Sequence, residues 1–590
     1  MLSYRKLAMR VLGRPLHTEG IDSPRPASQR AAAFVLTAAM LITLAAPAFA
    51  GTWYIENGDI TVKAGETKGT NKVSQGANQE VEDTNTIITN ENKDTASSHT
   101  VTIETNDKND TVEVTLKDVN IDASSRNNAA VSVTGSGNTT IKLDGDNALK
   151  SDTYRSGIYG SGSLTISGGE NDSLTAQGGS GADGIYGSGS LTISGGTVTA
   201  NGDDGGRGIS SRGGVTISGG STVTANGGNG TISGGDGICS SGGVTISGGS
   251  TVTANGGNGG SIGGGSGIYS NGSVTISGGT VTANGGKGGS GYGGDGIRSL
   301  DHVAISGGTV TANGGNSTNS SGGYGIISLD VAISSGTVTA NGGDSKDGYG
   351  GDGIHSNGVT ISSGTVNAAG GYGGKVGGYG ICSFDRVAIS GGTVEAAGGN
   401  GSTGGGSGIY SSVIDLSGSL ELTAKAGSPN GKALSQRGNE LDLNTIKDKL
   451  GPGAKVTATD ANGDSKQVSG PRPVEPEESS SSSDGGSAAP SAPASPLPGL
   501  TVTDKDGQRI SYTSTQSGNT LTVCVGRFTA SFRISLAALR QLRAEGIEAI
   551  TFQTILCSTT LSVDELLAMG GEDAEAVLTH RLTDSSLTVG

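Results

Sequence analysis

Residues 208–228 read GISSRGGVTISGGSTVTANGG, and this stretch decides the fold. It contains two short segments, 215–218 and 222–225, in which apolar and polar residues alternate. Alternation with a period of two is typical of β-strands, because successive side chains point to opposite faces. A glycine pair follows each segment, and glycine is well suited to tight turns. The stretch therefore predicts short strands joined by turns.

The same order of segments recurs along the chain. A Gly-Ile pair opens each unit, and successive pairs are 27, 24, 29, 30, 29, 29, 28, 27 and 28 residues apart. After each of these anchor isoleucines, the next apolar positions usually fall at +6, +8 and +13 or +14. A period near 28 residues indicates a repeat architecture. The glycines of the ten pairs are Gly157, Gly184, Gly208, Gly237, Gly267, Gly296, Gly325, Gly353, Gly380 and Gly408.

A parallel β-helix accounts for a unit of this size. Propeller blades need about 40 residues and four strands, which the unit cannot supply. No proline occurs from Ala48 to Ser428, which fits strands whose interior residues all donate hydrogen bonds to neighbouring coils. We therefore predict an all-β fold: a right-handed parallel β-helix with three short strands per coil, followed by a small C-terminal α+β domain.

Glycine accounts for 110 of the 590 residues. Because it follows no Gly-X-Y period and lacks accompanying proline, a collagen triple helix is excluded. Fixed glycines close the turns, and a variable surplus follows an Asn-Gly-Gly motif, where nearly all variation in coil length occurs. We expect these glycine-rich turns to be the most mobile part of each coil. The asparagines of the motif could form a ladder of side-chain amides: Asn201, Asn226, Asn255, Asn284, Asn313 and Asn341.

Composition divides the chain into segments. Residues 1–50 combine basic residues, an apolar run over 31–46 and the triplet Ala48-Phe49-Ala50, a pattern that predicts a signal peptide cleaved after Ala50. An uncleaved anchor is the alternative, although the run is short for a membrane span. The remaining segments are an N-terminal cap with divergent coils over 51–156, glycine-rich coils over 157–465, a disordered Pro/Ser-rich linker over 466–499 and the α+β domain over 500–590.

The net charge of −16 argues against nucleic acid as a partner, because the chain has no excess of basic residues to neutralise phosphates. Beyond the run over 31–46, no segment is apolar for long enough to span a bilayer. We therefore expect a secreted, extracellular protein without a membrane span in its mature chain. Attachment to the cell surface is left open.

The residue after each anchor isoleucine should point outward, and several of these residues are aromatic or basic. Exposed tyrosines among threonine ladders are typical of surfaces that bind sugars, since rings stack on pyranose faces. The alternative is structural, because tyrosine also packs well on sheets. As carbohydrate-binding candidates we take Tyr159, Tyr186, Tyr269, Arg298, His355 and Tyr410.

Two aspartates are candidates for a calcium site. Asp301 and Asp330 each lie four residues after an anchor isoleucine in adjacent coils, which predicts a separation of about 5 Å. Together with backbone carbonyls they could hold Ca²⁺. The alternative is that they cap backbone amides in turns. Four further aspartates precede anchors, but they lie in alternate coils and are too far apart to share one ion: Asp183, Asp236, Asp295 and Asp352.

The four cysteines fall into two pairs. Cys239 and Cys382 occupy the same coil position five coils apart, about 24 Å, which excludes a disulfide between them. Cys524 and Cys557 fall on two predicted strands of the terminal domain and could form a disulfide; two buried free thiols are the alternative. The five histidines show no zinc-site spacing.

Several of these motifs resemble a known family. The run from Val112-Glu113-Val114-Thr115-Leu116 to the later Asp-Gly-Ile coils, including Leu164-Thr165-Ile166-Ser167-Gly168-Gly169, resembles the secreted bacterial carbohydrate-binding β-helix family of the cellulose- or pectin-binding type. The resemblance covers about residues 52–425. It implies a right-handed β-helix, calcium as a cofactor and non-catalytic binding of polysaccharide at the cell surface.

Three functions compete at this point. The first is a non-catalytic carbohydrate-binding or adhesin-like protein, with a polysaccharide or a host glycan as its partner. The second is a structural spacer that projects the C-terminal domain. The third is a polysaccharide lyase, but no coil offers paired carboxylates or a calcium site combined with arginine. We therefore expect that the protein is not an enzyme.

Overall fold

The computed structural model describes residues 50–471, 499–504, 507–510, 512–517, 519–525, 529–554, 558–569, 574–580 and 585–589. The predicted signal peptide lies outside the described residues except for Ala50, and so does most of the predicted linker. The chain divides into two compact units, a repetitive one before the linker and a small one after it. Each unit is treated by itself.

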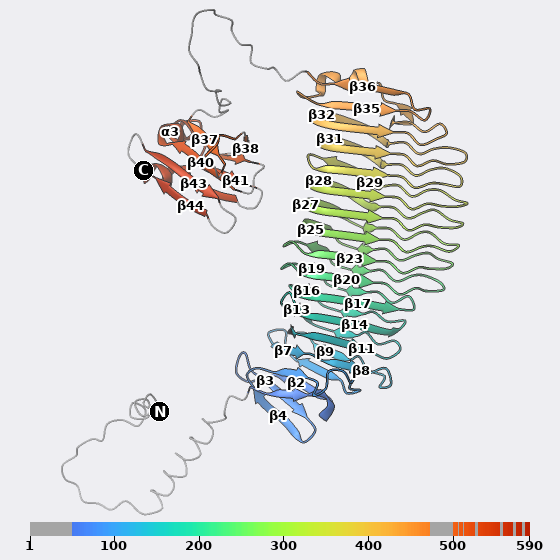
Figure 1. The fold of residues 1–590 in the computed structure, drawn as a ribbon, viewed down its shortest axis with the longest axis vertical. Coiled ribbons are helices and arrows are strands. Elements are labelled where there is room, and N and C mark those ends of the chain that lie inside the picture. Colours follow the sequence, from blue (N-terminus) through green and yellow to red (C-terminus); the bar gives the residue numbers. More distant parts are fainter. Residues whose placement is uncertain are drawn as a thin grey trace, which may run out of the picture. The chain divides into compact units, whose positions relative to one another are not determined.

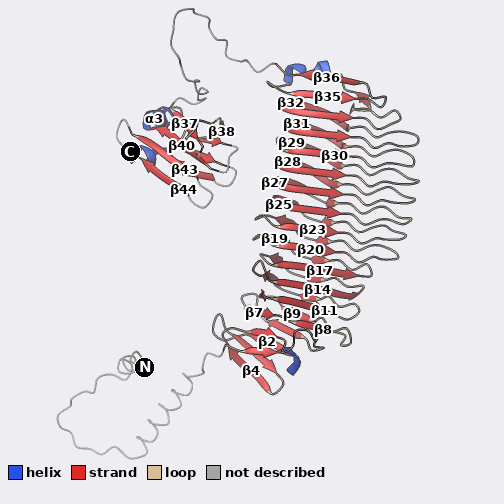
Figure 2. Cartoon of the chain, viewed as in Figure 1, coloured by secondary structure: helices blue, strands red, loops and turns tan. Residues whose placement is uncertain are grey.

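The first unit is a parallel β-solenoid of about 15 turns with a repeat of roughly 28 residues, which confirms the predicted fold (Figure 1). Its helical turns lie only at the two ends of the described solenoid (Figure 2): η1 (Ile55–Asn57) and η2 (Leu443–Lys449). The first turns contain β1 (Thr52–Tyr54), β2 (Ile60–Ala64), β3 (Asn71–Gln75), β4 (Asn78–Asp83), β5 (Ile87–Thr89), β6 (Val101–Thr105), β7 (Thr111–Lys117), β8 (Asn120–Asp122), β9 (Val131–Gly135), β10 (Asn138–Asp144) and β11 (Asp146–Lys150).

The glycine-rich coils follow, and in each of them a strand begins at the anchor isoleucine. Their strands are β12 (Ile158–Gly160), β13 (Ser163–Ser167), β14 (Ser173–Ser180), β15 (Ile185–Gly187), β16 (Leu191–Ile193), β17 (Thr197–Asp203), β18 (Ile209–Ser211), β19 (Val215–Ile217), β20 (Thr222–Asn226), β21 (Ile238–Ser240), β22 (Val244–Ile246), β23 (Thr251–Asn255), β24 (Ile268–Ser270), β25 (Val274–Asn284), β26 (Ile297–Ser299), β27 (His302–Asn313), β28 (Ile326–Asn341), β29 (Ile354–Ile361), β30 (Thr365–Ala369), β31 (Ile381–Ala397) and β32 (Ile409–Lys425).

Parallel pairing between coils keeps equivalent residues side by side. Ile209 pairs with Ile238, and in the same two coils Val215 pairs with Val244. The anchor isoleucines from Ile158 to Ile409 are fully buried and form a continuous apolar column inside the solenoid. From β25 onward, neighbouring strands of a coil merge, and in β28, β31 and β32 all three strands of the coil form one longer strand. The period-two alternation of the sequence therefore places one face of every strand in the core.

The asparagine ladder forms as predicted. Each asparagine donates from Nδ2 to the Oδ1 of its equivalent one coil earlier, at 2.8 Å in all five pairs from Asn226→Asn201 to Asn341→Asn313. Gln177 pairs with Asn201 at one end of the column, and Ala369 pairs with Asn341 at the other. The ladder therefore satisfies amide groups that lie at half-buried positions.

The glycine-rich segments form ordered arms. We call the residues between the asparagine column and the next Gly-Ile pair the glycine arm; it has six residues before Gly184 and Gly208, and ten or eleven in the later coils. Figure 1 shows these arms stacked in parallel along one edge of the solenoid. The two sides of each long arm are joined through backbone atoms. Gly265 N donates to Gly257 O at 2.9 Å, and Gly286 N of the next coil donates to Gly265 O at 2.8 Å.

This pattern of glycine-to-glycine hydrogen bonds continues from Gly228 to Gly427. It requires backbones to approach without side chains between them. A Cβ added at Gly286 would lie 1.9 Å from Gly257 O, and equivalent glycines show similar conflicts. The surplus glycine therefore builds a hydrogen-bonded layer; the expectation that these segments are the most mobile part of each coil stays a prediction.

Antiparallel hairpins cover both ends of the solenoid. At the N-terminal end, β3 pairs with β2 and β4 in antiparallel fashion. At the C-terminal end, β33 (Leu434–Gln436) pairs with β34 (Asn439–Glu440), and β35 (Lys455–Thr459) with β36 (Ser465–Ser469). Open strand edges promote association, so these hairpins protect the terminal coils.

The second unit is small and mixed, as the sequence predicts. One sheet contains β37 (Leu500–Thr503), β40 (Ala530–Ser535), β43 (Glu575–His580) and β44 (Ser585–Val589). The other contains β38 (Thr513–Ser517), β39 (Thr520–Cys524), β41 (Ala549–Gln553) and β42 (Ser558–Ser562). Two helices, α3 (Leu536–Ala544) and α4 (Val563–Ala568), each begin with a serine N-cap. Among the described residues, no helix is long and apolar enough to cross a membrane.

The glycine layer makes a direct prediction about stability. Gly286→Ala places a methyl group against the Gly257 carbonyl, so we expect a loss of about 3 kcal/mol or more, at the upper end of overpacking effects. Gly278→Ala is the matched control, because a Cβ there meets nothing within 4 Å. Thermal unfolding followed by circular dichroism checks both. Equal melting temperatures for the two variants would contradict the packing of the arms.

Candidate functional site

The residues that follow the anchor isoleucines form one column across the parallel strands, as predicted. Tyr159 pairs with Tyr186, which pairs with Ser210 in the next coil. Toward the N-terminus the column continues with Ser132 and Thr102. We call this set the outer column. Its remaining members follow in unbroken register: Cys239, Tyr269, Arg298, Ile327, His355, Cys382 and Tyr410.

The outer column is not the open, solvent-facing strip that the sequence suggested. Tyr159 is 39% exposed, but Ser210 is 5% and Cys382 only 2% exposed. The other tyrosines of the column, Tyr186, Tyr269 and Tyr410, are half-buried. The column therefore offers aromatic surface mainly at its N-terminal end.

Rings from the long glycine arms cover part of the column. Tyr324 stacks on His355 with ring centroids 4.5 Å apart, and Tyr379 stacks on Tyr410 at 5.0 Å. Both covering residues directly precede an anchor Gly-Ile pair, so they lie where a long arm returns to the sheet. His355 and Tyr410 therefore take part in packing within the protein.

A groove lies beside the six-residue arms. Its volume is about 610 Å³, and Thr102, Ser132, Tyr159 and Tyr186 of the outer column line it. Nearby turns and arms add Tyr154, which is 79% exposed, together with Asn128, Arg155 and Asp183. The rings of Tyr159 and Tyr186 stack 5.4 Å apart with an interplanar angle of 12°. We call this feature the tyrosine groove, because its lining combines aromatic faces with hydroxyl, amide and charged groups.

Arg298 is engaged by its own neighbours. Its Nη1 lies 3.2 Å from Asp295 Oδ2, and its guanidinium carbon lies 6.0 Å from the ring centroid of Tyr269. A second cavity of about 420 Å³ borders Arg298, and Tyr292 and Tyr324 also line it. Arg298 and Tyr269 therefore do not belong to the tyrosine groove.

The aspartates that precede anchors act as caps between coils. Asp183 Oδ1 accepts a hydrogen bond from Arg207 N at 2.8 Å, and Asp352 Oδ1 accepts one from Tyr379 N at 2.7 Å. Asp236 and Asp295 make the equivalent contact at 2.8 Å. Burial raises the pKa of the carboxyl groups of Asp183, Asp236 and Asp295, although the backbone hydrogen bonds lower it in part. Each of these aspartates therefore accepts a hydrogen bond from a backbone amide of the following coil.

Asp301 and Asp330, the predicted calcium ligands, are not paired across adjacent coils as the sequence count assumed. Asp330 pairs with His302, and the amide of Leu329 donates to the carbonyl of Asp301. The cause is a first turn that is one residue shorter in the coil of Asp330, so counting from the anchor isoleucines misaligns the two coils. The Asp301 carboxylate contacts His302 Nδ1 at 2.8 Å and Ser273 Oγ at 2.7 Å. Calcium binding here stays a prediction without support from the register.

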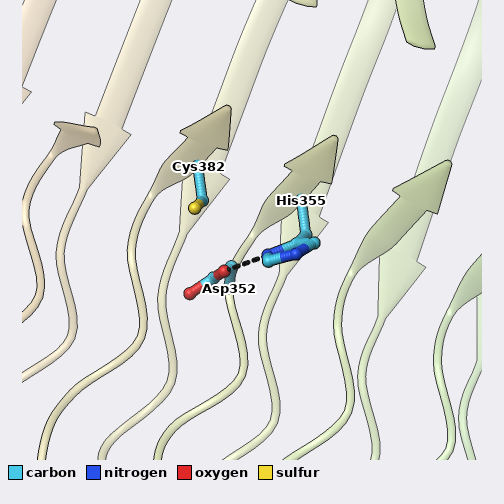
Figure 3. Close-up of side chains that lie close together, drawn as sticks. All are labelled: Asp352, His355 and Cys382. Atoms are coloured by element: carbon cyan, nitrogen blue, oxygen red, sulfur yellow. Dashed lines mark hydrogen bonds and ion pairs between the residues drawn. The ribbon is translucent and has the colours of Figure 1, made fainter. Parts of the chain in front are cut away.

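A different cluster was missed by the sequence argument against metal sites. Asp352, His355 and Cys382 bring one ligand atom each to within 4.8 Å of the others (Figure 3). His355 Nδ1 lies 2.7 Å from Asp352 Oδ2, and Cys382 is the register partner of His355 in the next coil. The signal becomes visible only when the coils are aligned, because Asp352 and His355 are three residues apart and Cys382 lies 27 residues further on.

The solenoid thiols are poor nucleophiles in this structure. Burial raises the pKa of the Cys239 thiol to about 12, and burial together with Asp352 raises the pKa of the Cys382 thiol as well. A nucleophilic cysteine needs the opposite shift, because the thiolate is the reactive form. The proximity of Cys382 to a histidine and an aspartate therefore does not amount to an activated catalytic triad.

Cys524 is one of the two cysteines predicted to pair in the terminal domain. Its Sγ atom lies 3.4 Å from Gln553 Oε1. Cys557 lies outside the described residues, so the Cys524–Cys557 disulfide stays a prediction.

Comparison with known proteins gives no family assignment. No protein-family model, curated protein or solved structure matches this chain. The resemblance to carbohydrate-binding β-helices is therefore supported at the level of the parallel β-helix alone.

The raised thiol pKa of Cys239 predicts slow alkylation. At pH 8 a pKa of about 12 instead of 9.0 lowers the thiolate fraction about 1,000-fold. Iodoacetamide should therefore modify Cys239 much more slowly in the folded protein than in urea, as measured by peptide mass spectrometry. Rapid labelling of Cys239 in folded protein would show that this part of the outer column is open to solvent.

Proposed function

We propose that the protein is an extracellular, non-catalytic carbohydrate-binding protein with an adhesin-like role, and that the tyrosine groove is its glycan site. The observation that carries the proposal is the stacked pair of Tyr159 and Tyr186 in a groove of about 610 Å³. The predicted signal peptide supports the extracellular location.

The groove offers the two kinds of contact that a sugar ring requires. Aromatic faces provide large apolar contact area, which suits the C–H groups of a pyranose ring. Around them, Thr100, Asn128 and Ser156 supply hydrogen-bond donors and acceptors for sugar hydroxyls. Ligand sites generally combine apolar contact with a few polar groups that fix orientation.

Charge favours a neutral glycan over an acidic one. The chain carries a net charge of −16, and the carboxyl group of Asp183 lies in the groove lining. Arg155 is the one cationic side chain in that lining, and its Nη2 contacts Asn127 Oδ1 at 3.4 Å. An acidic polymer such as polygalacturonate would therefore meet net repulsion, whereas a cello-oligosaccharide would not.

A structural spacer is the second candidate. It is favoured by the regularity of the coils, in which the asparagine ladder and the glycine layer repeat without interruption over several coils. Contacts that repeat in every coil make the solenoid rigid, and a rigid spacer needs no ligand. In this case the groove would be a by-product of the short arms.

Binding to glycans distinguishes the two candidates. Chain 51–590 should bind a neutral oligosaccharide on a glycan array or in calorimetry with cello-oligosaccharides. Tyr159→Ala and Tyr186→Ala should each weaken binding about 10-fold, because each removes one face of the stacked pair (about 0.5–1.5 kcal/mol beyond area burial).

Tyr292→Ala is the matched control for this experiment, since Tyr292 is an exposed tyrosine (64%) outside the tyrosine groove. Its affinity should equal that of the wild type. If no neutral or acidic glycan binds, or if the three variants bind equally, the tyrosine groove is not a glycan site and the spacer role gains support.

A further inference from the structure

Three side chains of types that can ligate a metal meet beside the outer column, away from the tyrosine groove. Asp352 is 5% exposed and Cys382 is 2% exposed, while the His355 side chain is 19% exposed. Figure 3 shows the three side chains gathered together, with a hydrogen bond between Asp352 and His355. Within the part of the chain that the structure describes, no other group of three histidine, cysteine or acidic residues comes this close together.

We propose that Asp352, His355 and Cys382 form a binding site for a zinc-like transition-metal ion. The donor set of one sulfur, one imidazole nitrogen and one carboxylate oxygen matches the ligands of zinc. Calcium and magnesium take oxygen ligands alone and are disfavoured here. Three protein ligands leave a fourth tetrahedral position for water.

The spacing of the donor atoms fits after small side-chain rotations. Zinc bonds of about 2.0–2.3 Å in tetrahedral geometry hold ligand atoms about 3.3–3.6 Å apart. The three donor atoms lie within 4.8 Å of one another, and Asp352 Oδ2 to His355 Nδ1 is 2.7 Å. A metal ion needs a thiolate and an unprotonated imidazole nitrogen as ligands, so its binding would release the protons that these two atoms carry.

The surroundings of the cluster hold the ligands in position. His355 lies between Tyr324, stacked at 4.5 Å, and Phe384, in edge contact at 5.2 Å. Asp352 Oδ1 accepts the backbone amide of Tyr379, which leaves Oδ2 for the metal. Contacts of this kind orient metal ligands and are part of what makes a site selective.

Equivalent positions around the other solenoid cysteine lack the remaining two ligands. Cys239 follows its anchor isoleucine as Cys382 does, but the positions that correspond to Asp352 and His355 in the preceding coil hold Arg207 and Ser210. There Arg207 Nε lies 3.5 Å from Asp236 Oδ2, so a cation already occupies the position near the carboxylate. The two coils therefore provide a matched comparison within one protein.

Metal titration of chain 51–590 tests the site. Wild-type protein should bind one equivalent of Zn²⁺ in calorimetry, and Co²⁺ should give a thiolate-to-cobalt charge-transfer band. Cys382→Ser and His355→Gln should weaken zinc binding at least about 10-fold, and Cys382→Ser should abolish the charge-transfer band.

The control variants are Cys239→Ser and His302→Gln, which remove a thiol and an imidazole outside the cluster. Both should bind zinc and cobalt as the wild type does. Circular dichroism confirms that each variant is folded, and the retained cobalt band of Cys239→Ser identifies the ligating thiol. Equal metal binding by wild type and Cys382→Ser would overturn the proposal, as would absence of the band in the wild type.

A second inference comes from the N-terminal end of the solenoid. The Asp83 carboxylate is 1% exposed and accepts three N–H groups: Gly51 N at 3.0 Å, Asn85 N at 3.0 Å and Trp53 Nε1 at 2.8 Å. No lysine, arginine or histidine of the described residues forms an ion pair with it. Three N–H donors stabilise this carboxylate, and a positive charge on one of them would add an ion pair to an existing hydrogen bond.

We infer that cleavage after Ala50 supplies this charge. Hydrolysis of the Ala50–Gly51 bond consumes one water, leaving a carboxylate on Ala50 and an ammonium group on Gly51. The nitrogen that gains the charge is the one that contacts Asp83. The site also suits glycine, because a Cβ at position 51 would lie 2.6 Å from Trp53 Nε1. The ammonium group of Gly51 then forms a buried ion pair with Asp83, and this ion pair stabilises the first coil.

Two chain starts test this inference. Protein that begins at Gly51 should melt about 2–4 °C higher than protein that begins at Ala50, in which the ammonium is displaced by one residue. Trp53, the one tryptophan of the chain, reports this end through its fluorescence. In Asp83→Asn the difference should disappear. Equal melting of the two starts, or a difference that persists in Asp83→Asn, would overturn the ion pair.

Discussion

In-register hydrogen bonding between successive coils is the interaction on which the rest of the structure depends. One coil buries only a few large side chains, and their burial does not offset the entropy lost by ordering about 28 residues. The deficit is met by neighbours: each coil donates and accepts along its strands, its asparagine and its glycine arm. Because these contacts link equivalent positions, any side chain placed once per coil becomes a column.

The glycine arms of successive coils are also joined by in-register hydrogen bonds, and these bonds link backbone atoms with no side chains between them. Their backbones approach so closely that a Cβ would overlap a carbonyl oxygen of the neighbouring coil. Ordering glycine costs more conformational entropy than ordering any other residue, because its backbone is the most flexible in the unfolded chain. The structure offsets that cost with hydrogen bonds on both sides of the arm, such as Gly294 N to Gly286 O and Gly315 N to Gly294 O. The high glycine content is therefore a packing requirement along this edge.

Periodicity was enough to predict the coils, the buried anchors and the asparagine ladder, because these depend on spacing within one unit. It failed where a property depends on the arm or on a change in coil length. Asp301 and Asp330 share a count from their anchors but not a register, because one turn is shorter. Asp352, His355 and Cys382 meet only after adjacent coils are aligned, so their spacing in the sequence matched no metal motif.

Arm length connects the fold to the two candidate sites. Where the arms have six residues, Tyr159 remains exposed and the tyrosine groove stays open. Where they have ten or eleven, Tyr324 and Tyr379 reach back over the outer column, and Cys382 is buried. A surface ligand needs the first environment, whereas a metal ion with a thiolate ligand is favoured by the second, where bulk water is excluded and the ligands are held. One column of equivalent positions thus includes an exposed tyrosine beside six-residue arms and a buried cluster of potential metal ligands beside arms of ten and eleven residues.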